Sequence, residues 1–308
     1  MTTERADRAY LTARVLPRMT LGSGTSTDLT APPSPLSPSL TPAERARERF
    51  RPSGNAIVTG GAGDLGFAVC KALLEHGVQG LAIFDLDATA AQARISVLED
   101  EFPEVRIKFF KVDITDEEAV DTAVAQTVSL LGPVTTLINF AGMVACGHAL
   151  DLRSKDWDRM LNVNTVGGFF VARAVARHMI LQKIGGSIIF IASASAHQVN
   201  FPQPQAPYNV SKAGVKAMVR SLAGEWARYG IRVNSISPGY MDTILNEGEG
   251  LEESKKIWLS RNPLGRMGQP DELCGAAVML ASRAGSYFNG SDREYLPVPI
   301  PFVSLLPH

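Results

Sequence analysis

Short apolar runs alternate with helical patterns along most of this chain, and that alternation restricts its fold more than any other feature. Apolar runs occur at 56–60, 81–87, 106–113, 136–142, 187–193 and 231–239. Helical patterns lie between them, at 65–75, 88–101, 117–131, 157–182 and 208–229. Strands alternating with helices form βαβ units, and continuous apolar runs are typical of strands buried on both faces. We therefore predict an α/β fold with a doubly wound parallel sheet and helices on both faces.

The chain divides into three segments. Residues 1–50 have few large apolar residues and include the stretch APPSPLSPSL, so we expect a disordered extension that cannot offset its ordering entropy by burial. Within it, Thr41, Pro42 and Glu44 predict the start of a short helix over 41–50. Residues 51–292 should form a single domain. Residues 293–308 contain four prolines, so we expect an irregular tail there rather than a central strand.

Composition limits the classes of partner and the compartment. The formal net charge is −1, which favours neither nucleic acid nor an anionic membrane as a partner. Cys70, Cys146 and Cys274 lie far apart without metal-ligand spacing, so we expect buried free thiols, no metal and a cytoplasmic location. Arginines in the first twenty residues raise a mitochondrial presequence as the alternative, but Glu4 and Asp7 argue against it.

A glycine-rich turn, TGGAGDLG at 59–66, follows the first strand and opens the first helix. We expect Gly60, Leu65 and Gly66 to bring the backbone close to a pyrophosphate at the helix N-terminus, as in a Rossmann-type dinucleotide site. Asp85 ends the second strand, where an acid binds ribose hydroxyls and repels a 2′-phosphate. The expected cofactor is NAD or NADP, with NAD favoured. The alternative is that Asp85 or Asp87 only caps the next helix.

The segment YNVSK places Tyr208 and Lys212 four residues apart at the start of a helix, and therefore on one face. Tyrosine has an ordinary pKa near 10, and a neighbouring ammonium lowers it by stabilising the phenolate. The pair is therefore a sensible general acid and base. Ser193 ends the preceding strand, so its hydroxyl should open at the same edge of the sheet; the alternative is a turn or cap residue.

Taken together, these motifs resemble the short-chain dehydrogenase/reductase family over about residues 53–292. The matching segments, in order, are TGGAGDLG, VDI (112–114), NFAG (139–142), VNTVGGF (163–169), GGSIIFIAS (185–193), YNVSK and SPGYMDT (237–243). The loop VNFPQPQAP before YNVSK further resembles the branch of mannitol dehydrogenases and sorbose or xylulose reductases. The resemblance implies an NAD(P)-dependent oxidoreductase that moves a hydride between the cofactor and an alcohol or ketone.

The resemblance also implies a catalytic set. Tyr208 would protonate the carbonyl oxygen in reduction or deprotonate the alcohol in oxidation. Lys212 would lower the pKa of Tyr208 and bind the nicotinamide ribose, and Ser193 would orient the substrate oxygen. Asn164 would hold a water that links Lys212 to solvent.

Four more residues would contact or support the cofactor by the same resemblance. Asp113 and Ile114 would border the adenine, Asn139 would support the central strand, and Thr243 would meet the nicotinamide carboxamide. The segment 243–268 is expected to cover the substrate, for which a ketose/polyol pair is the first candidate and a ketone of secondary metabolism the second. A homo-oligomer, tetramer or dimer, is expected because two helical segments carry apolar residues on more than one side.

Asp64 departs from the family's pattern, which has glycine at this place in the turn. A carboxylate there would sit where the pyrophosphate should bind and repel it. Together with the altered C-terminus, it leaves a non-catalytic, dinucleotide-binding paralogue as the alternative function. An epimerase or dehydratase that keeps the cofactor is a third possibility, because a fold does not determine a reaction.

Overall fold

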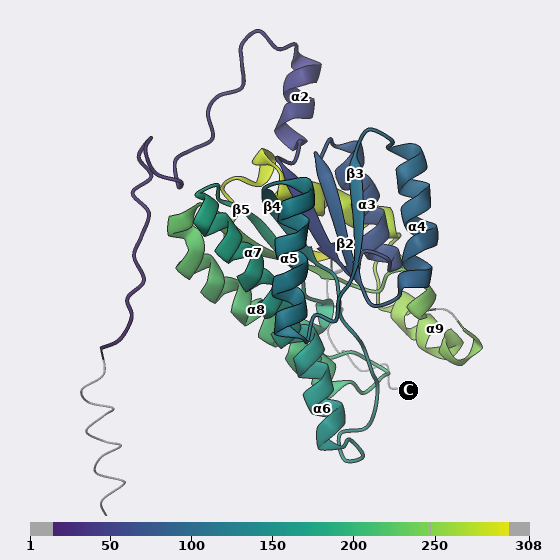
Figure 1. Cartoon of the computed structure of the whole chain (residues 1–308). Coiled ribbons are helices and arrows are strands. Elements are labelled where there is room, and N and C mark those ends of the chain that lie inside the picture. Colours follow the sequence, from purple (N-terminus) through teal and green to yellow (C-terminus); the bar gives the residue numbers. More distant parts are fainter. Residues whose placement is uncertain (1–14, 247, 296–308) are drawn as a thin grey trace, which may run out of the picture.

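The structure, a computed structural model of the chain, describes residues 15–246 and 248–295. Seven strands form one parallel sheet in the order β3-β2-β1-β4-β5-β6-β7 (Figure 1). The strands are β1 Asn55–Thr59, β2 Gly80–Asp85, β3 Arg106–Lys111, β4 Val134–Asn139, β5 Gly186–Ile191, β6 Ile231–Pro238 and β7 Asp292–Tyr295. The chain order reverses between β1 and β4, and such a reversal opens a crevice at the carboxyl ends of the strands.

Helices cover both faces of this sheet (Figure 1). On one face pack α5 (Glu117–Leu131), α7 (Gly168–Gln182) and α8 (Ala206–Trp226). On the other face pack α3 (Asp64–Glu75), α4 (Ala88–Glu101) and α10 (Cys274–Ala281). The predicted doubly wound α/β fold is therefore confirmed.

The long helix expected over 157–182 is interrupted. It consists of α6 (Ser154–Leu161), a π-helical turn at Asn162–Gly167 and then α7. Such a turn holds one more residue than the α-helical repeat and often lies at functional sites. Here it buries Asn164, whose amide holds the loop after β4 and the start of α8, as described below.

Shorter elements complete the described chain. The helix α9 spans Glu252–Ser260, and 3₁₀ turns lie at Ala194–Ala196, Ala227–Tyr229, Ile244–Asn246, Glu249–Leu251, Pro270–Leu273 and Arg283–Gly285. Within the described residues, no helix is both long and apolar enough to cross a membrane. The three cysteines are free, but Cys146 is exposed rather than buried as expected.

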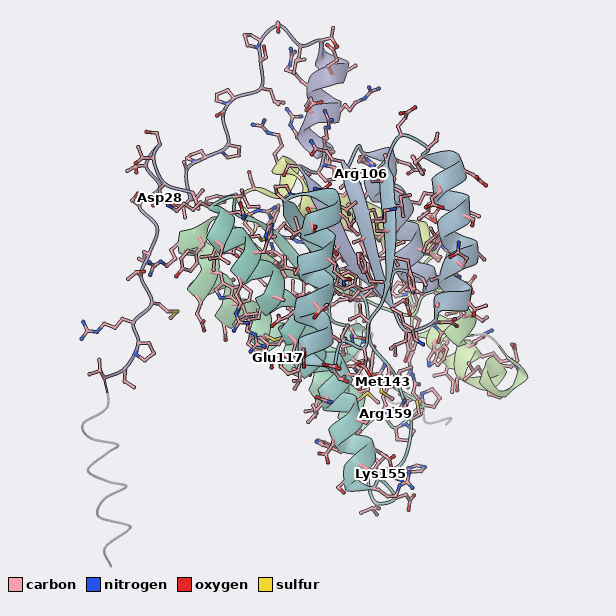
Figure 2. The ribbon with its side chains drawn as sticks, in the orientation of Figure 1. Asp28, Arg106, Glu117, Met143, Lys155 and Arg159 are labelled. Carbon is pink, nitrogen blue, oxygen red and sulfur yellow. The ribbon has the colours of Figure 1, made fainter. Side chains whose placement is uncertain are left out.

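The N-terminal extension contains the predicted helix, α2 at Pro42–Phe50. Thr41 and Glu44 form its capping box, because the side chain of each accepts a hydrogen bond from the backbone of the other. Residues 15–40 contain turns but no helix or strand, and the turn at Asp28 lies at the side of the molecule (Figure 2), where Leu29 packs against Gly230, just before β6. The disorder expected for residues 1–50 otherwise stays a prediction.

The C-terminal expectation needs a correction. We expected residues 293–308 to be irregular, but β7 at Asp292–Tyr295 pairs in parallel with β6 over Ser235–Pro238. This strand lies at the sheet edge and ends before the first of the four prolines, so it keeps every backbone donor that it needs. Residues 296–308 lie outside the described part of the chain.

Candidate active site

A large cavity, of about 1790 Å³, runs along the carboxyl edge of the sheet. Arg159, on α6, and Met143, in the loop after β4, both line it and lie close together (Figure 2). Ten of the twelve residues proposed from the sequence also line it: Gly60, Leu65, Gly66, Asp85, Asp113, Ile114, Ser193, Tyr208, Lys212 and Thr243. The other two, Asn139 and Asn164, are buried polar residues. The fold thus brings the two ends of the predicted site to one cavity.

The glycine-rich turn is tight, and its glycines are required. Gly60 has a positive φ of 65°, and a Cβ atom at Gly66 would lie 2.3 Å from the Gly60 carbonyl oxygen. The turn leads into α3, whose N-cap residue Gly63 makes no side-chain cap. Because the first backbone N–H groups of a helix lack intrahelical acceptors, this end of α3 presents donors to the cavity.

The carboxylate of Asp64 is paired within the protein, whereas we expected an unpaired charge that would repel a pyrophosphate. Its Oδ1 is paired with the guanidinium of Arg94 from α4, and its Oδ2 accepts a hydrogen bond from the backbone N–H of Ile244 at 3.0 Å. The contact with Arg94 is the main cause of a lowered Asp64 pKa. Asp64 therefore stays ionised, and the opposing charge of Arg94 offsets its repulsion of a phosphate.

Asp85 and Asp87 differ in what they contact, which decides which of them caps the next helix. Asp87 caps α4, accepting from the backbone of Thr89 and Ala90. Asp85 lies at the end of β2 and lines the cavity, where its Oδ2 accepts from the Ala62 N–H at 3.0 Å. Asp85 is therefore not the helix cap, and it connects the second strand to the glycine-rich turn.

The other residues that the sequence suggested for cofactor binding lie in or behind the same cavity. Asp113 holds its own loop by accepting from the backbone and hydroxyl of Thr115, and Ile114 is buried next to it. Asn139 ends β4, donates to the Gly168 carbonyl at 3.5 Å and accepts from the Thr59 hydroxyl at 3.4 Å. It therefore ties the ends of β1 and β4 together from behind the cavity.

Ser193, Tyr208 and Lys212 come together where β5 ends beside α8. Tyr208 and Lys212 share a helix face, with Lys212 Nζ 5.7 Å from the centre of the Tyr208 ring. Nζ is buried and donates to the Ile191 carbonyl at 2.8 Å. Burial lowers the pKa of Lys212 to about 8. This lysine can therefore change its charge near physiological pH.

The pKa of Tyr208 is raised, not lowered as the sequence suggested. Burial is the main cause, and a hydrogen bond with the Ser193 side chain partly opposes it. The reason is that a buried phenolate loses hydration, while the ammonium of Lys212 is hydrogen-bonded to the Ile191 carbonyl instead. At neutral pH Tyr208 therefore carries its proton, as a group that donates to a carbonyl oxygen must.

Asn164 connects this group to the loop after β4. Its Oδ1 accepts from the Met143 N–H at 2.8 Å, and its Nδ2 donates to the Met143 carbonyl at 2.9 Å. Nδ2 also donates to the Ser211 hydroxyl, which donates in turn to the Tyr208 carbonyl at 2.7 Å. The π-helical turn thus positions an amide that holds the start of α8.

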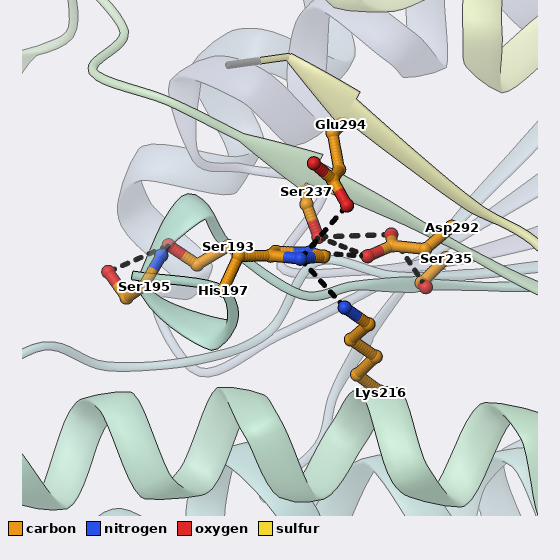
Figure 3. A network of polar contacts seen from close by, with 8 residues as sticks. All are labelled: Ser193, Ser195, His197, Lys216, Ser235, Ser237, Asp292 and Glu294. Carbon is orange, nitrogen blue, oxygen red and sulfur yellow. Dashed lines mark hydrogen bonds and ion pairs between the residues drawn. The ribbon is translucent and has the colours of Figure 1, made fainter. Parts of the chain in front are cut away.

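The turn that carries Ser193 is held by a polar network around His197 (Figure 3). His197 Nε2 lies 2.7 Å from the Asp292 carboxylate of β7, and Nδ1 lies 2.9 Å from Glu294. The hydroxyls of two β6 residues, Ser235 and Ser237, donate to Asp292. The last described strand therefore supports the turn that carries Ser193.

Three side chains of this network offer ligand atoms within 4.8 Å of one another, namely His197, Asp292 and Glu294. Lys216 Nζ, however, lies 2.7 Å from His197 Nδ1 (Figure 3). An ammonium at this distance opposes a second cation electrostatically. We therefore interpret the cluster as a network of polar contacts within the protein.

Tyr240 and Gln203, which form one wall of the cavity with Trp258, were not predicted from the sequence. Tyr240, after β6, stacks on Trp258 of α9 with ring centres 4.3 Å apart. Gln203 joins them, accepting from Trp258 Nε1 and donating to the Tyr240 hydroxyl, both at 3.0 Å. The available signal was the amide-rich loop FPQPQ at 201–205, directly before the tyrosine motif. Trp258 confirms that the segment 243–268 contributes to the cavity.

Comparison with known proteins agrees with this fold. A family model described as enoyl-(acyl carrier protein) reductase matches residues 60–293. The chain is 39% identical over 248 residues to galactitol 2-dehydrogenase of Rhizobium johnstonii, covering 80% of this chain and 95% of that protein. It is 37% identical to the NADP-dependent mannitol dehydrogenase of Hypocrea jecorina, covering 81% and 94%.

A solved structure gives the same result. The gluconate 5-dehydrogenase of Burkholderia cenocepacia, in complex with NADP and tartrate, superposes with a TM-score of 0.74 at 32% identity and covers 81% of this chain and 96% of its own. The fold and the sequence matches define an NAD(P)-dependent oxidoreductase that acts between an alcohol and a ketone. The chain belongs to the short-chain dehydrogenase/reductase family, in its branch of mannitol and other polyol dehydrogenases.

Proposed function

We propose that Tyr208, Lys212, Ser193 and Asn164 carry the proton chemistry of this oxidoreductase. The observation that carries the proposal is the meeting of Ser193 and Tyr208 in the cavity, above a lysine buried on the same helix. In reduction, Tyr208 donates its proton to the substrate oxygen, and Ser193 holds that oxygen. Lys212 stabilises the phenolate that remains, and Asn164 links Lys212 to solvent through a water.

The cavity fits a dinucleotide. The uncapped N-terminus of α3 suits a pyrophosphate near Gly60, Leu65 and Gly66, because its free backbone N–H groups line the cavity. Gly66 lets the turn pack this closely, since a Cβ there would clash with the Gly60 carbonyl. Asp113, Ile114, Asn139 and Thr243 would border or support the adenine and nicotinamide ends. When bound, the nicotinamide ring supplies or accepts the hydride.

We propose NAD as the preferred cofactor, because the Asp85 carboxylate at the end of β2 suits ribose hydroxyls and repels a 2′-phosphate. Arg94 lines the same part of the cavity and is the feature that favours NADP. Its ion pair with Asp64 reduces its attraction for a phosphate. The ratio of kcat/KM with NADH to that with NADPH tests the preference, and a ratio below one would overturn it.

A polyol and its ketose are the substrates that we propose. Several amide and hydroxyl groups line the substrate end of the cavity, among them Asn200, Gln203 and Tyr240, and such groups can bind several substrate hydroxyls. The names of the compared relatives point the same way. A ketone of secondary metabolism is the second candidate, because the stacked Tyr240 and Trp258 rings could also bind a larger apolar substrate.

The non-catalytic alternative loses its main support, since Asp64 is paired with Arg94 and the sheet still gains β7. Oxidation of galactitol, D-mannitol and D-arabinitol, followed by the absorbance of NADH or NADPH, tests the activity. Tyr208→Phe should lower kcat by about 10²–10⁴-fold, the usual contribution of a general acid or base, while the affinity for the cofactor stays within about twofold. Retention of most of the wild-type kcat would refute the assignment.

We also propose a homo-oligomer and a cytoplasmic location. Val166, Leu181 and Val210 are exposed on the helical layer, and apolar residues on an outer helix face favour a partner surface. The three free cysteines suit a reducing compartment. Light scattering tests the assembly, and a monomer at micromolar concentration would count against it.

A further inference from the structure

A second tyrosine stands beside the proposed reaction centre. Tyr240 follows β6, and Ser193 follows the neighbouring strand β5, so both side chains lie at the carboxyl edge of adjacent strands. Tyr240, Ser193 and Tyr208 line the same cavity. Burial is the main cause of the raised Tyr208 pKa, and Tyr240 adds to it. The two phenols are therefore close enough to interact.

The position of the Tyr240 hydroxyl is fixed by its ring and its neighbours. The ring stacks on Trp258 with an interplanar angle of 11°. Trp258 Nε1–H can only donate, and it donates to Gln203 Oε1. Gln203 must then present its Nε2 to Tyr240, and it donates to the phenol oxygen at 3.0 Å.

Asn200 completes the hydrogen bonding of the phenol oxygen. Its Nδ2 donates to Tyr240 Oη at 3.2 Å, so this oxygen already accepts two hydrogen bonds. Among the described residues, nothing accepts the proton of the Tyr240 hydroxyl. The hydroxyl proton is therefore left to donate into the cavity that Tyr240 lines, where an oxygen of a bound molecule would accept it.

We propose that Tyr240 donates a hydrogen bond to a second oxygen of the substrate, beside the reacting carbon, and so selects vicinal diols and α-hydroxy ketones over simple alcohols and ketones. This inference rests on the proposed function. It assigns to Tyr240 a specificity role that is separate from the proton transfer of Tyr208. A substrate that lacks the second oxygen leaves the phenol proton without an acceptor, which is a strong basis for discrimination.

The orientation of the Asn200 amide decides whether this proton is available. In the structure Nδ2 faces the phenol and Oδ1 is buried without a partner among the described residues; the reversed amide would turn Oδ1 to the phenol and accept its proton. A carboxylate at this position cannot donate to Tyr240 and would instead accept its proton. Asn200→Asp therefore removes the donor from the cavity while the phenol stays in place. Tyr240→Phe removes the hydroxyl while the ring keeps its stacking on Trp258.

The test compares 2,3-butanediol with 2-butanol, which share a carbon skeleton and differ by one hydroxyl. The wild-type enzyme should prefer the diol in kcat/KM. Tyr240→Phe and Asn200→Asp should each lower the ratio of the two kcat/KM values by about tenfold, which is the effect of one hydrogen bond to a substrate. Thermal melting and cofactor titration of each variant show that the fold and the dinucleotide site are intact.

The outcomes separate this inference from the proposed function. Equal kcat/KM for diol and monoalcohol in the wild-type enzyme, or an unchanged ratio in both variants, overturns the assignment of Tyr240 and leaves the oxidoreductase activity standing. Absence of turnover of any polyol or butanol by the wild-type enzyme, with NAD and with NADP, overturns the proposed function and this inference together.

Discussion

Lys212 should destabilise the folded protein at neutral pH, and Lys212→Met tests this expectation. Burial lowers the pKa of Lys212 from 10.5 to about 8. Since one pKa unit corresponds to about 1.36 kcal/mol, keeping the ammonium in this site costs about 3 kcal/mol well below pH 8. Methionine fills a similar volume without a charge. It also leaves the Ile191 carbonyl without its donor, and an unpaired buried carbonyl costs about 1–3 kcal/mol.

The sign of the pH dependence follows from the two pKa values. Between pH 8 and pH 10.5 the unfolded chain binds the proton that the folded chain has lost, so the stability of the wild-type protein rises with pH in this window. The full penalty is present below pH 8 and is gone above pH 10.5. The free energy of unfolding of Lys212→Met should therefore exceed that of the wild type by roughly 1 kcal/mol near pH 7 and fall below it near pH 10.

Urea unfolding, followed by tryptophan fluorescence at a fixed protein concentration, measures this difference. The variant should be inactive at both pH values, so added stability and lost turnover would occur together. Lys155→Met, at an exposed position on α6, serves as the control for the loss of a surface charge. A difference between wild type and Lys212→Met that is the same at both pH values would refute the reasoning.

Two further predictions concern the same cavity. Burial raises the pKa of Tyr208, so the phenol can donate its proton at neutral pH but must lose that proton before it can accept one. The value of kcat/KM for alcohol oxidation should therefore rise with pH, and that for ketone reduction should fall at high pH. Coincident pH profiles for the two directions would contradict this assignment. Asp64→Asn releases Arg94 from its ion pair while an amide oxygen can still accept from Ile244 N–H, so affinity for NADP relative to NAD should rise by about three- to tenfold. Calorimetric titration of both dinucleotides at low and high salt measures the change, and an unchanged ratio would show that Arg94 does not face the ribose.

Helices whose first residue is fixed by a cap close in the sequence could be predicted from the sequence. The helix bounds 88–101 and 117–131 match α4 and α5, because Asp87 and Asp116 cap them through backbone donors two and three residues away. The motifs at strand ends, together with the family resemblance that supplied Asp113, Ile114 and Thr243, also led to ten proposed residues that line one cavity. Parallel strands all end at one edge of the sheet, so this required no knowledge of distant contacts.

The features that the sequence did not predict depend on contacts between distant parts of the chain. Asp64 meets Arg94 thirty residues later and Ile244 from the far side of the cavity. Tyr240 depends in the same way on Gln203 and on Trp258. The edge strand β7 depends on pairing with β6 and on the side-chain contacts of Asp292. The four prolines that follow it in the sequence led us to expect no strand there.

The π-helical turn at Asn162–Gly167 has a consequence for chain length in this region. An α-helix advances by about 100° per residue. Deletion of one residue between α6 and α7 would let the two helices run on as one, with α6 rotated by about that angle relative to α7. The amide of Asn164 would then leave the loop at Met143 and the hydroxyl of Ser211. The length of this helix is therefore as constrained as the identity of the residues it carries, and an insertion or deletion here should be less tolerated than most single substitutions.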